Sequence, residues 1–152
     1  MNKPKHLYHG SSKRVDVLVP HQAEDFLNPA GSEYGVWATS NRDVALTFAL
    51  GAVPDETGAV IRVMRLQDLN PVRMVFVQGH PNFGGKGYLY TVSSQGFEHV
   101  GGEVWICQNP VTPVEVLEIN VDDYLHLFRY ATEEEKRELQ RESGSRAEDE
   151  VG

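Results

Sequence analysis

GVWATSNRDVALTFA, residues 35–49, is the stretch that decides the fold. Its first five residues are apolar, aromatic or β-branched around Trp37, a composition that predicts a short buried strand. The helix predicted to follow at once carries Val44, Ala45, Phe48 and Ala49 at the spacing that forms one apolar stripe. We therefore expect a strand and a helix that run back over each other and organise the domain.

Sequence signals mark both ends of this helix. Ser40 followed by Asp43 is close to a capping box, which predicts the N-terminus, and Gly51 is placed to end the helix in a left-handed conformation. With the strand and the helix packed together, Trp37 and Phe48 can form the two walls of one slot. Large aromatics more often belong to the core, so core packing is the competing interpretation.

Length and composition fit a single domain. The 152 residues, 40% of them hydrophobic, suffice for one core, and we expect the domain to span residues 1–142. Residues 143–152 are polar and mostly acidic, which predicts a disordered tail that solubilises the chain or contacts a partner protein. The net charge of −8 argues against non-specific binding to nucleic acid.

The sequence also predicts the compartment. It has no long apolar run and no basic leader followed by an apolar segment, so we expect no membrane span, no secretory signal and a soluble, cytoplasmic protein. The single Cys107 cannot form an internal disulfide, which agrees with a reducing environment. The histidines and Cys107 show no metal-ligand spacing, so no metal site is expected.

Strand patterns dominate the rest of the chain. Strands are predicted over residues 5–9, 59–66, 74–78, 88–92, 103–108 and 114–119, separated by Gly- and Pro-rich turns. Residues 96–102 read as one such turn, and residues 122–130 as a short amphipathic helix. Thr132 with Glu135 forms a capping box that opens a charged helix. The long irregular segment 12–34 is typical of a functional loop, and the elements together predict a mixed α+β domain.

Three consecutive residues at the end of the first predicted strand form a candidate site. His9, Gly10 and Ser11 offer an imidazole, a position without a side chain and a hydroxyl. Gly10 allows a ligand or another backbone to come close. A histidine at a strand end is more often structural than catalytic, so both interpretations of His9 stay open. Ser11 lacks a nucleophile-elbow context, which makes it a poor nucleophile.

Glu103 is the exceptional residue of the second half, because it follows two glycines and opens an otherwise apolar strand. One interpretation is a solvated carboxylate at a strand end. The other is a carboxylate that the sheet holds in a cleft, where it can bind a hydroxyl or stabilise developing positive charge.

Together these segments resemble the catalytic domain of the ADP-ribosyltransferases of the diphtheria-toxin and poly(ADP-ribose) polymerase type. The signature of that family is His, Tyr and Glu on three separate strands. The segment HGS (9–11) is similar to the first-strand motif, and GVWA (35–38) is similar to the second, with Trp37 at the Tyr position. Phe48 falls at the second aromatic of the family, and Glu103 at its glutamate.

The resemblance covers residues 6–119 and implies an ADP-ribosyltransferase-like fold: two small, mostly antiparallel sheets that form a central cleft, flanked by short helices. It also implies NAD as co-substrate, with the cationic nicotinamide ring between Trp37 and Phe48. Residues 20–34 would match the loop that covers the bound dinucleotide. Trp37 in place of Tyr keeps the aromatic face but loses the hydroxyl.

The other site residues follow from the same resemblance. The backbone of Gly10, in the motif it shares with Ser11, would hold the nicotinamide carboxamide, and His9 would bind a ribose hydroxyl of the adenosine half. Glu103 would bind the nicotinamide ribose and stabilise the positive charge that develops as the glycosidic bond breaks. Ala45 stands where many members have a Ser that bonds the carboxamide, so one contact is lost.

The implied activity is transfer of ADP-ribose from NAD to a protein, nucleic-acid or small-molecule acceptor, with His9 and Glu103 as catalytic residues and release of nicotinamide. One alternative is a degenerate module that binds NAD or ADP-ribose without chemistry, as Trp37 and Ala45 indicate. Another is an RNA 2′-phosphotransferase, which shares the fold and uses NAD but relies on several Arg and His residues in its site. A purely structural protein is the last alternative.

Overall fold

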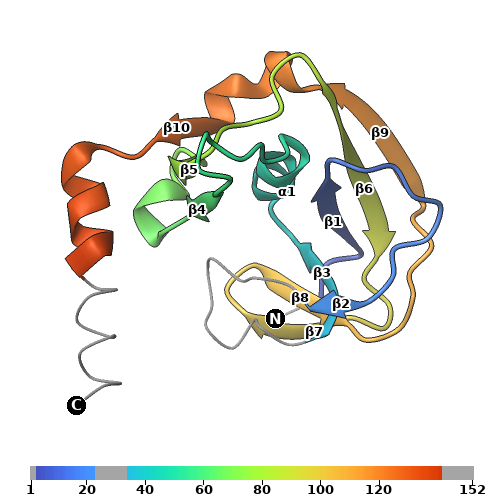
Figure 1. Cartoon of the computed structure of the whole chain (residues 1–152). Helices are drawn as coiled ribbons and strands as arrows, with labels where there is room; N and C mark the ends of the chain where they lie inside the picture. Colours follow the sequence, from blue (N-terminus) through green and yellow to red (C-terminus); the bar gives the residue numbers. More distant parts are fainter. Residues whose placement is uncertain (1–2, 23–33, 142–152) are drawn as a thin grey trace.

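The computed structural model describes residues 3–22 and 34–141 of the chain (Figure 1). A seven-stranded sheet contains most of the strands, with its main path in the order β7-β8-β3-β1-β6-β9 and with β2 paired to β3. Every strand pair of this large sheet is antiparallel. Its strands are β1 (His6–Ser11), β2 (His21–Gln22), β3 (Tyr34–Thr39), β6 (Lys86–Ser93), β7 (Glu98–Gly101), β8 (Val104–Cys107) and β9 (Glu115–Asn120).

A small sheet and the helices complete the fold. The small sheet has the order β10-β5-β4, and its strands β10 and β5 are parallel. Its strands are β4 (Ile61–Val63), β5 (Met74–Gln78) and β10 (Phe128–Tyr130). The helices are α1 (Arg42–Ala49), the 3₁₀ helices η2 (Leu66–Asp68) and η3 (Val121–Leu127), and a helix over 133–141. The mixed α+β class with two sheets is therefore confirmed.

Helix α1 lies between the two sheets (Figure 1). One buried cluster joins Ala45, Leu46 and Ala49 to Leu89 and other residues of the large sheet. A second buried cluster joins Val44 to residues of the small sheet, among them Phe76. One of the two sheets is larger than expected, because it has seven strands, and α1 packs against both sheets through these two clusters. The ADP-ribosyltransferase-like fold with a central cleft stays a prediction.

Two glycines allow α1 to lie directly on the large sheet. A Cβ atom at Gly10 would stand 1.7 Å from the carbonyl oxygen of Ala45, and one at Gly87 would stand 1.9 Å from the carbonyl oxygen of Ala49. Gly10 is in β1 and Gly87 in the neighbouring β6, so the helix backbone rests on both strands. Any side chain at either position would push the helix away from the sheet.

Asn41, and not Ser40, caps the N-terminus of α1. The Asn41 Oδ1 accepts hydrogen bonds from the backbone N–H groups of Asp43 at 3.1 Å and Val44 at 3.3 Å. Asn is at least as good an N-cap as Ser, so the cap can form at Asn41, one residue after the predicted position. The predicted C-terminus is confirmed, because Gly51 has a φ of 72° and its N–H bonds to the carbonyl of Phe48.

Four other segments differ from the predicted elements. Strand β1 continues through Ser11, which pairs with Tyr88. Residues 98–101, predicted as a turn, form β7 on β8, and residues 122–130, predicted as a helix, divide into η3 and β10. The strand predicted over 59–66 shortens to β4. In each case the pairing of strands, or its absence, overrides the local pattern, whether the partner strand is next in the chain, as for β7 and β8, or distant, as for β1 and β6.

One ionic network ties the last helix to the small sheet. The guanidinium of Arg129 in β10 donates to both carboxylate oxygens of Glu135, at 2.7 and 2.8 Å, and to Asp68 Oδ1 at 3.3 Å. The predicted capping box is confirmed, since the Thr132 N–H donates to Glu135 Oε1 at 2.9 Å and the Glu135 N–H donates to Thr132 Oγ1 at 3.1 Å. The Arg129 hydrogen bond, above all, lowers the pKa of Glu135 to about 2.

Two expectations fall on other parts of the chain. Residues 23–33, most of the loop expected over NAD, and the tail expected over 143–152 lie outside the described residues. No helix within residues 3–22 and 34–141 has the length and apolar character needed to cross a membrane.

Candidate functional site

Three adjacent strands carry the residues that resemble the family signature. Strands β8, β3 and β1 are consecutive in the large sheet. His9 is in β1, Trp37 is in β3 and pairs with Ile106 of β8, and Glu103 immediately precedes the first residue of β8. The fold thus brings the backbones of three residues separated by up to 94 positions into neighbouring strands.

The His9 imidazole bridges β1 and β3. The two strands pair through Tyr8 and Thr39, and one residue further along β1 the His9 Nδ1 lies 2.6 Å from the carbonyl oxygen of Trp37. A carbonyl oxygen can only accept, so Nδ1 carries the hydrogen and Nε2 keeps a lone pair. Nε2 makes no hydrogen bond within the part of the chain that the structure describes.

Burial decides the charge of this imidazole. Desolvation lowers the pKa of His9 below its ordinary value, the bond to the Trp37 carbonyl opposes this shift in part, and the nearby His21 adds to it. The neutral form of His9 therefore predominates at neutral pH, with Nε2 as a hydrogen-bond acceptor.

Tyr90 supports His9 and was missed in the sequence analysis. Its ring centroid lies 5.9 Å from that of His9, and the two residues pair across β1 and β6. The Tyr90 hydroxyl donates to the Lys13 carbonyl at 2.7 Å and accepts from the Val15 N–H at 2.8 Å. Tyr90 thereby fixes the chain that leaves β1 just after the HGS motif. The one signal in the sequence that indicates an inward-facing Tyr90 is the alternating pattern of residues 88–92.

The two aromatics expected to clamp nicotinamide both lie on the α1 side of the large sheet. Val36 and Ala38 point into the buried cluster on the opposite face, so strand alternation turns Trp37 toward the α1 face. Phe48 is on α1 itself, half-buried beside the small-sheet cluster, with the Arg62 guanidinium carbon 5.6 Å from its ring centroid. A slot between Trp37 and Phe48 stays a prediction.

Glu103 stands in the turn between β7 and β8 with its side chain exposed. The turn depends on Gly101 and Gly102, whose φ angles are 151° and 53°. The Glu103 carbonyl accepts a hydrogen bond of 3.0 Å from the Ser40 N–H, which fixes the turn at the junction of β3 and α1. Among the described residues no group bonds to the Glu103 carboxylate, so it is free to meet a ligand.

The remaining predicted residues have evident structural roles. Gly10 accommodates the Ala45 carbonyl, and the Ala45 side chain is buried against the large sheet. The Ser11 Oγ accepts a hydrogen bond of 3.1 Å from the Lys13 N–H and so shapes the turn after β1. These roles explain the residue types at the three positions without a ligand, and their contacts to NAD stay predictions.

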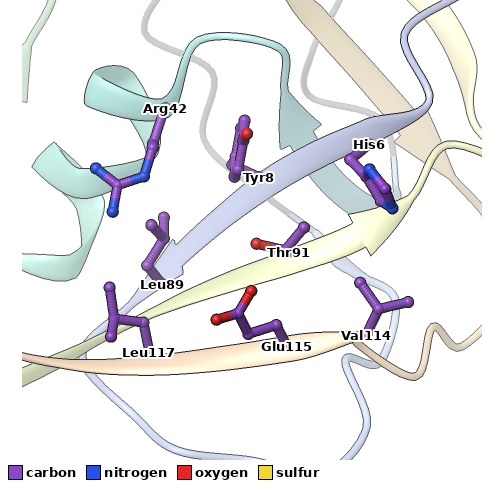
Figure 2. A pocket seen from close by; sticks show the side chains of 8 residues that line it. All are labelled: His6, Tyr8, Arg42, Leu89, Thr91, Val114, Glu115 and Leu117. Atoms are coloured by element: carbon purple, nitrogen blue, oxygen red, sulfur yellow. The ribbon is translucent and has the colours of Figure 1, made fainter.

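A cavity of about 350 Å³ opens on the α1 face of the large sheet, and it includes none of the predicted site residues (Figure 2). It is lined by His6, Tyr8, Arg42, Leu89, Thr91, Val114, Glu115 and Leu117. The sequence analysis missed this cavity because no local motif joins its residues. Only the cross-strand register, with Thr91 between Tyr8 and Glu115, brings them together.

Comparison with known proteins assigns no family. No protein-family profile, no curated protein and no solved structure matches this chain. Within the described ranges 3–22 and 34–141, no group of three or more His, Cys, Asp or Glu side chains is arranged to hold a metal ion. The functional argument therefore depends on the geometry of the strands and side chains.

Proposed function

We propose that this chain is an NAD-dependent ADP-ribosyltransferase, which transfers ADP-ribose to an acceptor and releases nicotinamide. The observation that carries the proposal is the order of β8, β3 and β1. This order sets Glu103, Trp37 and His9 on, or directly beside, three neighbouring strands. The His9 side chain lies with Tyr90 on the face of the large sheet opposite to Trp37.

His9 suits the recognition of a ribose. Its Nδ1 is already used by the Trp37 carbonyl, at 2.6 Å, and this bond fixes both the ring orientation and the tautomer. The neutral Nε2 can then accept a hydrogen bond from a ribose hydroxyl of NAD. Burial lowers the pKa of His9, so this acceptor persists at neutral pH.

Glu103 suits the bond-breaking step. The bond between the ribose carbon and the nicotinamide nitrogen breaks, its electron pair goes to the nitrogen, and positive charge develops on the ribose carbon. A carboxylate beside that carbon stabilises the charge. The acceptor then bonds to the same carbon and loses a proton. Because the Glu103 side chain is exposed, an acceptor can approach from solvent.

A binding module without chemistry is the second candidate. The buried Ala45 favours it, because an alanine methyl group gives the nicotinamide carboxamide no hydrogen bond. Such a protein would bind NAD or ADP-ribose and leave the glycosidic bond intact.

An assay of nicotinamide release separates the two candidates. Purified chain is incubated with NAD and mixed acceptors, and released nicotinamide and labelled acceptor are both measured. We expect release that Glu103→Ala abolishes and that Glu98→Ala preserves, since Glu98 is an exposed carboxylate of the same hairpin. Binding of NAD without release would favour the module. Absence of binding to both NAD and ADP-ribose would overturn both candidates.

A further inference from the structure

The cavity of Figure 2 combines a polar row with an apolar row. Tyr8, Thr91 and Glu115 lie directly opposite one another across β1, β6 and β9. One step along the same face, Leu89 pairs with Leu117. Side chains of one face that are neighbours across a sheet form a continuous surface. The floor of the cavity is therefore an aliphatic strip beside a strip of hydroxyl and carboxylate groups.

Arg42 reaches this floor from α1. It lies one helical turn before Leu46, which is buried in the cluster that contains Leu89, so Arg42 is on the sheet-facing side of the helix. Figure 2 shows its guanidinium on the same side of the sheet as the polar row. The close packing of α1 at Gly10 and Gly87 holds the helix, and with it Arg42, against the sheet.

The polar side chains of the cavity have no partners of their own. The side chains of His6, Tyr8, Arg42, Thr91 and Glu115 form no hydrogen bond or ion pair with any other residue in the ranges that the structure describes. Arg42 and Glu115 thus stand in one cavity with opposite charges that do not neutralise each other. Opposite charges that line one cavity without pairing are suited to charge-assisted bonds with a ligand.

We propose that this cavity binds a small zwitterion. Its carboxylate would bind Arg42, its ammonium would bind Glu115, and a short aliphatic chain between them would cover Leu89 and Leu117. The cavity volume of about 350 Å³ suits a molecule of this size. The proposal is independent of ADP-ribosyl transfer, because none of these four residues belongs to the predicted NAD site.

Isothermal titration calorimetry of the full chain with ε-aminocaproate tests the proposal. We expect saturable binding, and at least about tenfold weaker binding of hexanoate and pentylamine, each of which lacks one charge. Arg42→Gln and Glu115→Gln should each weaken binding of ε-aminocaproate by about tenfold. Glu118→Gln, on the opposite face of β9, and Arg73→Gln, an exposed arginine away from the cavity, are the matched controls and should leave it unchanged.

Three results would overturn the proposal. The first is that ε-aminocaproate shows no saturable binding at millimolar concentration. The second is that hexanoate or pentylamine binds as tightly as the zwitterion. The third is that the affinity for ε-aminocaproate is unchanged in both Arg42→Gln and Glu115→Gln. Both residues are exposed, so the variants should fold, and thermal melting checks this. If the zwitterion does not bind, the expected release of nicotinamide and its dependence on Glu103 are unaffected.

Discussion

Two groups of charged side chains, one beside the small sheet and one along the large sheet, differ in whether they have bonding partners. Arg129, Asp68 and Glu135 are bonded to one another, and they join η2, β10 and the last helix. Glu103 and Arg42, at the two sides of the β3–α1 junction, have no side-chain partner among the described residues. Charges of the first group hold elements together, whereas those of the second group are available to a ligand.

This difference separates stability from function. Removal of one member of a bonded, partly buried network leaves its partners desolvated and unpaired, so the free energy of unfolding falls. Removal of an exposed, unpaired charge changes that free energy little. If the second group serves a ligand, its substitution should instead reduce binding or turnover. Each substitution below is therefore judged on the free energy of unfolding and on ligand binding or turnover.

Glu103→Gln should have the largest effect, and it should act on turnover alone. The amide keeps the size of the side chain but cannot stabilise positive charge on the ribose, so nicotinamide release should fall by about a hundredfold to a thousandfold. The unfolding midpoint should hardly change, because the side chain is exposed. Initial rates and thermal melting of the same preparation test this. A lower midpoint with unchanged release would give Glu103 a structural role.

Arg129→Ala should have the largest effect on stability, a loss of about 3 kcal/mol in the free energy of unfolding. The Asp68 side chain is only 6% exposed and would lose its ion-pair partner, and Glu135 would lose both guanidinium bonds. Urea denaturation measures the loss. Arg129→Lys is the control, because it keeps the charge but not the two-pronged geometry and should retain part of the stability. A loss below about 0.5 kcal/mol would contradict the structural role of the network.

The sequence predicts best the elements whose signals are local. The β-strand at residues 74–78 has the same bounds in the structure, and the Thr132 capping box is present as predicted. The start of α1 shows the limit of such signals, because Ser40 and Asn41 are both good caps. In the structure Asn41 takes the cap position, and the Ser40 N–H bonds to the Glu103 carbonyl. That bond joins residues far apart in sequence.

The site depends more on long-range contacts, so less of it is predictable. The sequence places His9, Trp37 and Glu103 on separate strands, but the adjacency of these strands comes from the sheet order. The tautomer of His9 depends on a carbonyl 28 positions away. The position of Gly10 beneath α1 and the polar row of the cavity likewise arise from packing and register. No local pattern encodes such contacts.

His9→Asn should reduce NAD affinity by about tenfold, which corresponds to roughly 1.4 kcal/mol. The Asn amide can still donate to the Trp37 carbonyl, as Nδ1 does, but it does not reach the position of Nε2. Titration calorimetry with NAD measures the change. His126→Asn, on an exposed histidine of η3, is the matched control. Equal affinities of His9→Asn and the unmodified chain would remove His9 from the ligand site.

The pH dependence of NAD binding gives a second test of His9. The pKa of His9 is lowered by burial, so the neutral form should persist as pH falls through the ordinary value of about 6.5. Affinity should decline only at lower pH, when Nε2 takes up a proton and can no longer accept. Because the pKa of His9 is lowered in the folded chain, His9 also contributes to the stability of the fold at pH above its ordinary pKa of about 6.5. This contribution is lost as pH falls through the lowered pKa. His9→Asn should remove both dependences.

Glu135→Gln should have the smallest effect, a loss of about 1 kcal/mol in the free energy of unfolding at neutral pH, because the carboxylate is partly solvated. The pKa of Glu135 in the folded chain is about 2, below the ordinary value of 4.5. The stabilising contribution is therefore complete above pH 4.5 and is lost as pH falls toward about 2. Urea denaturation across this acid range should give a shallower pH dependence for Glu135→Gln than for the unmodified chain. Equal slopes for Glu135→Gln and the unmodified chain would show that the bonds of Glu135 do not contribute to the pH dependence of stability.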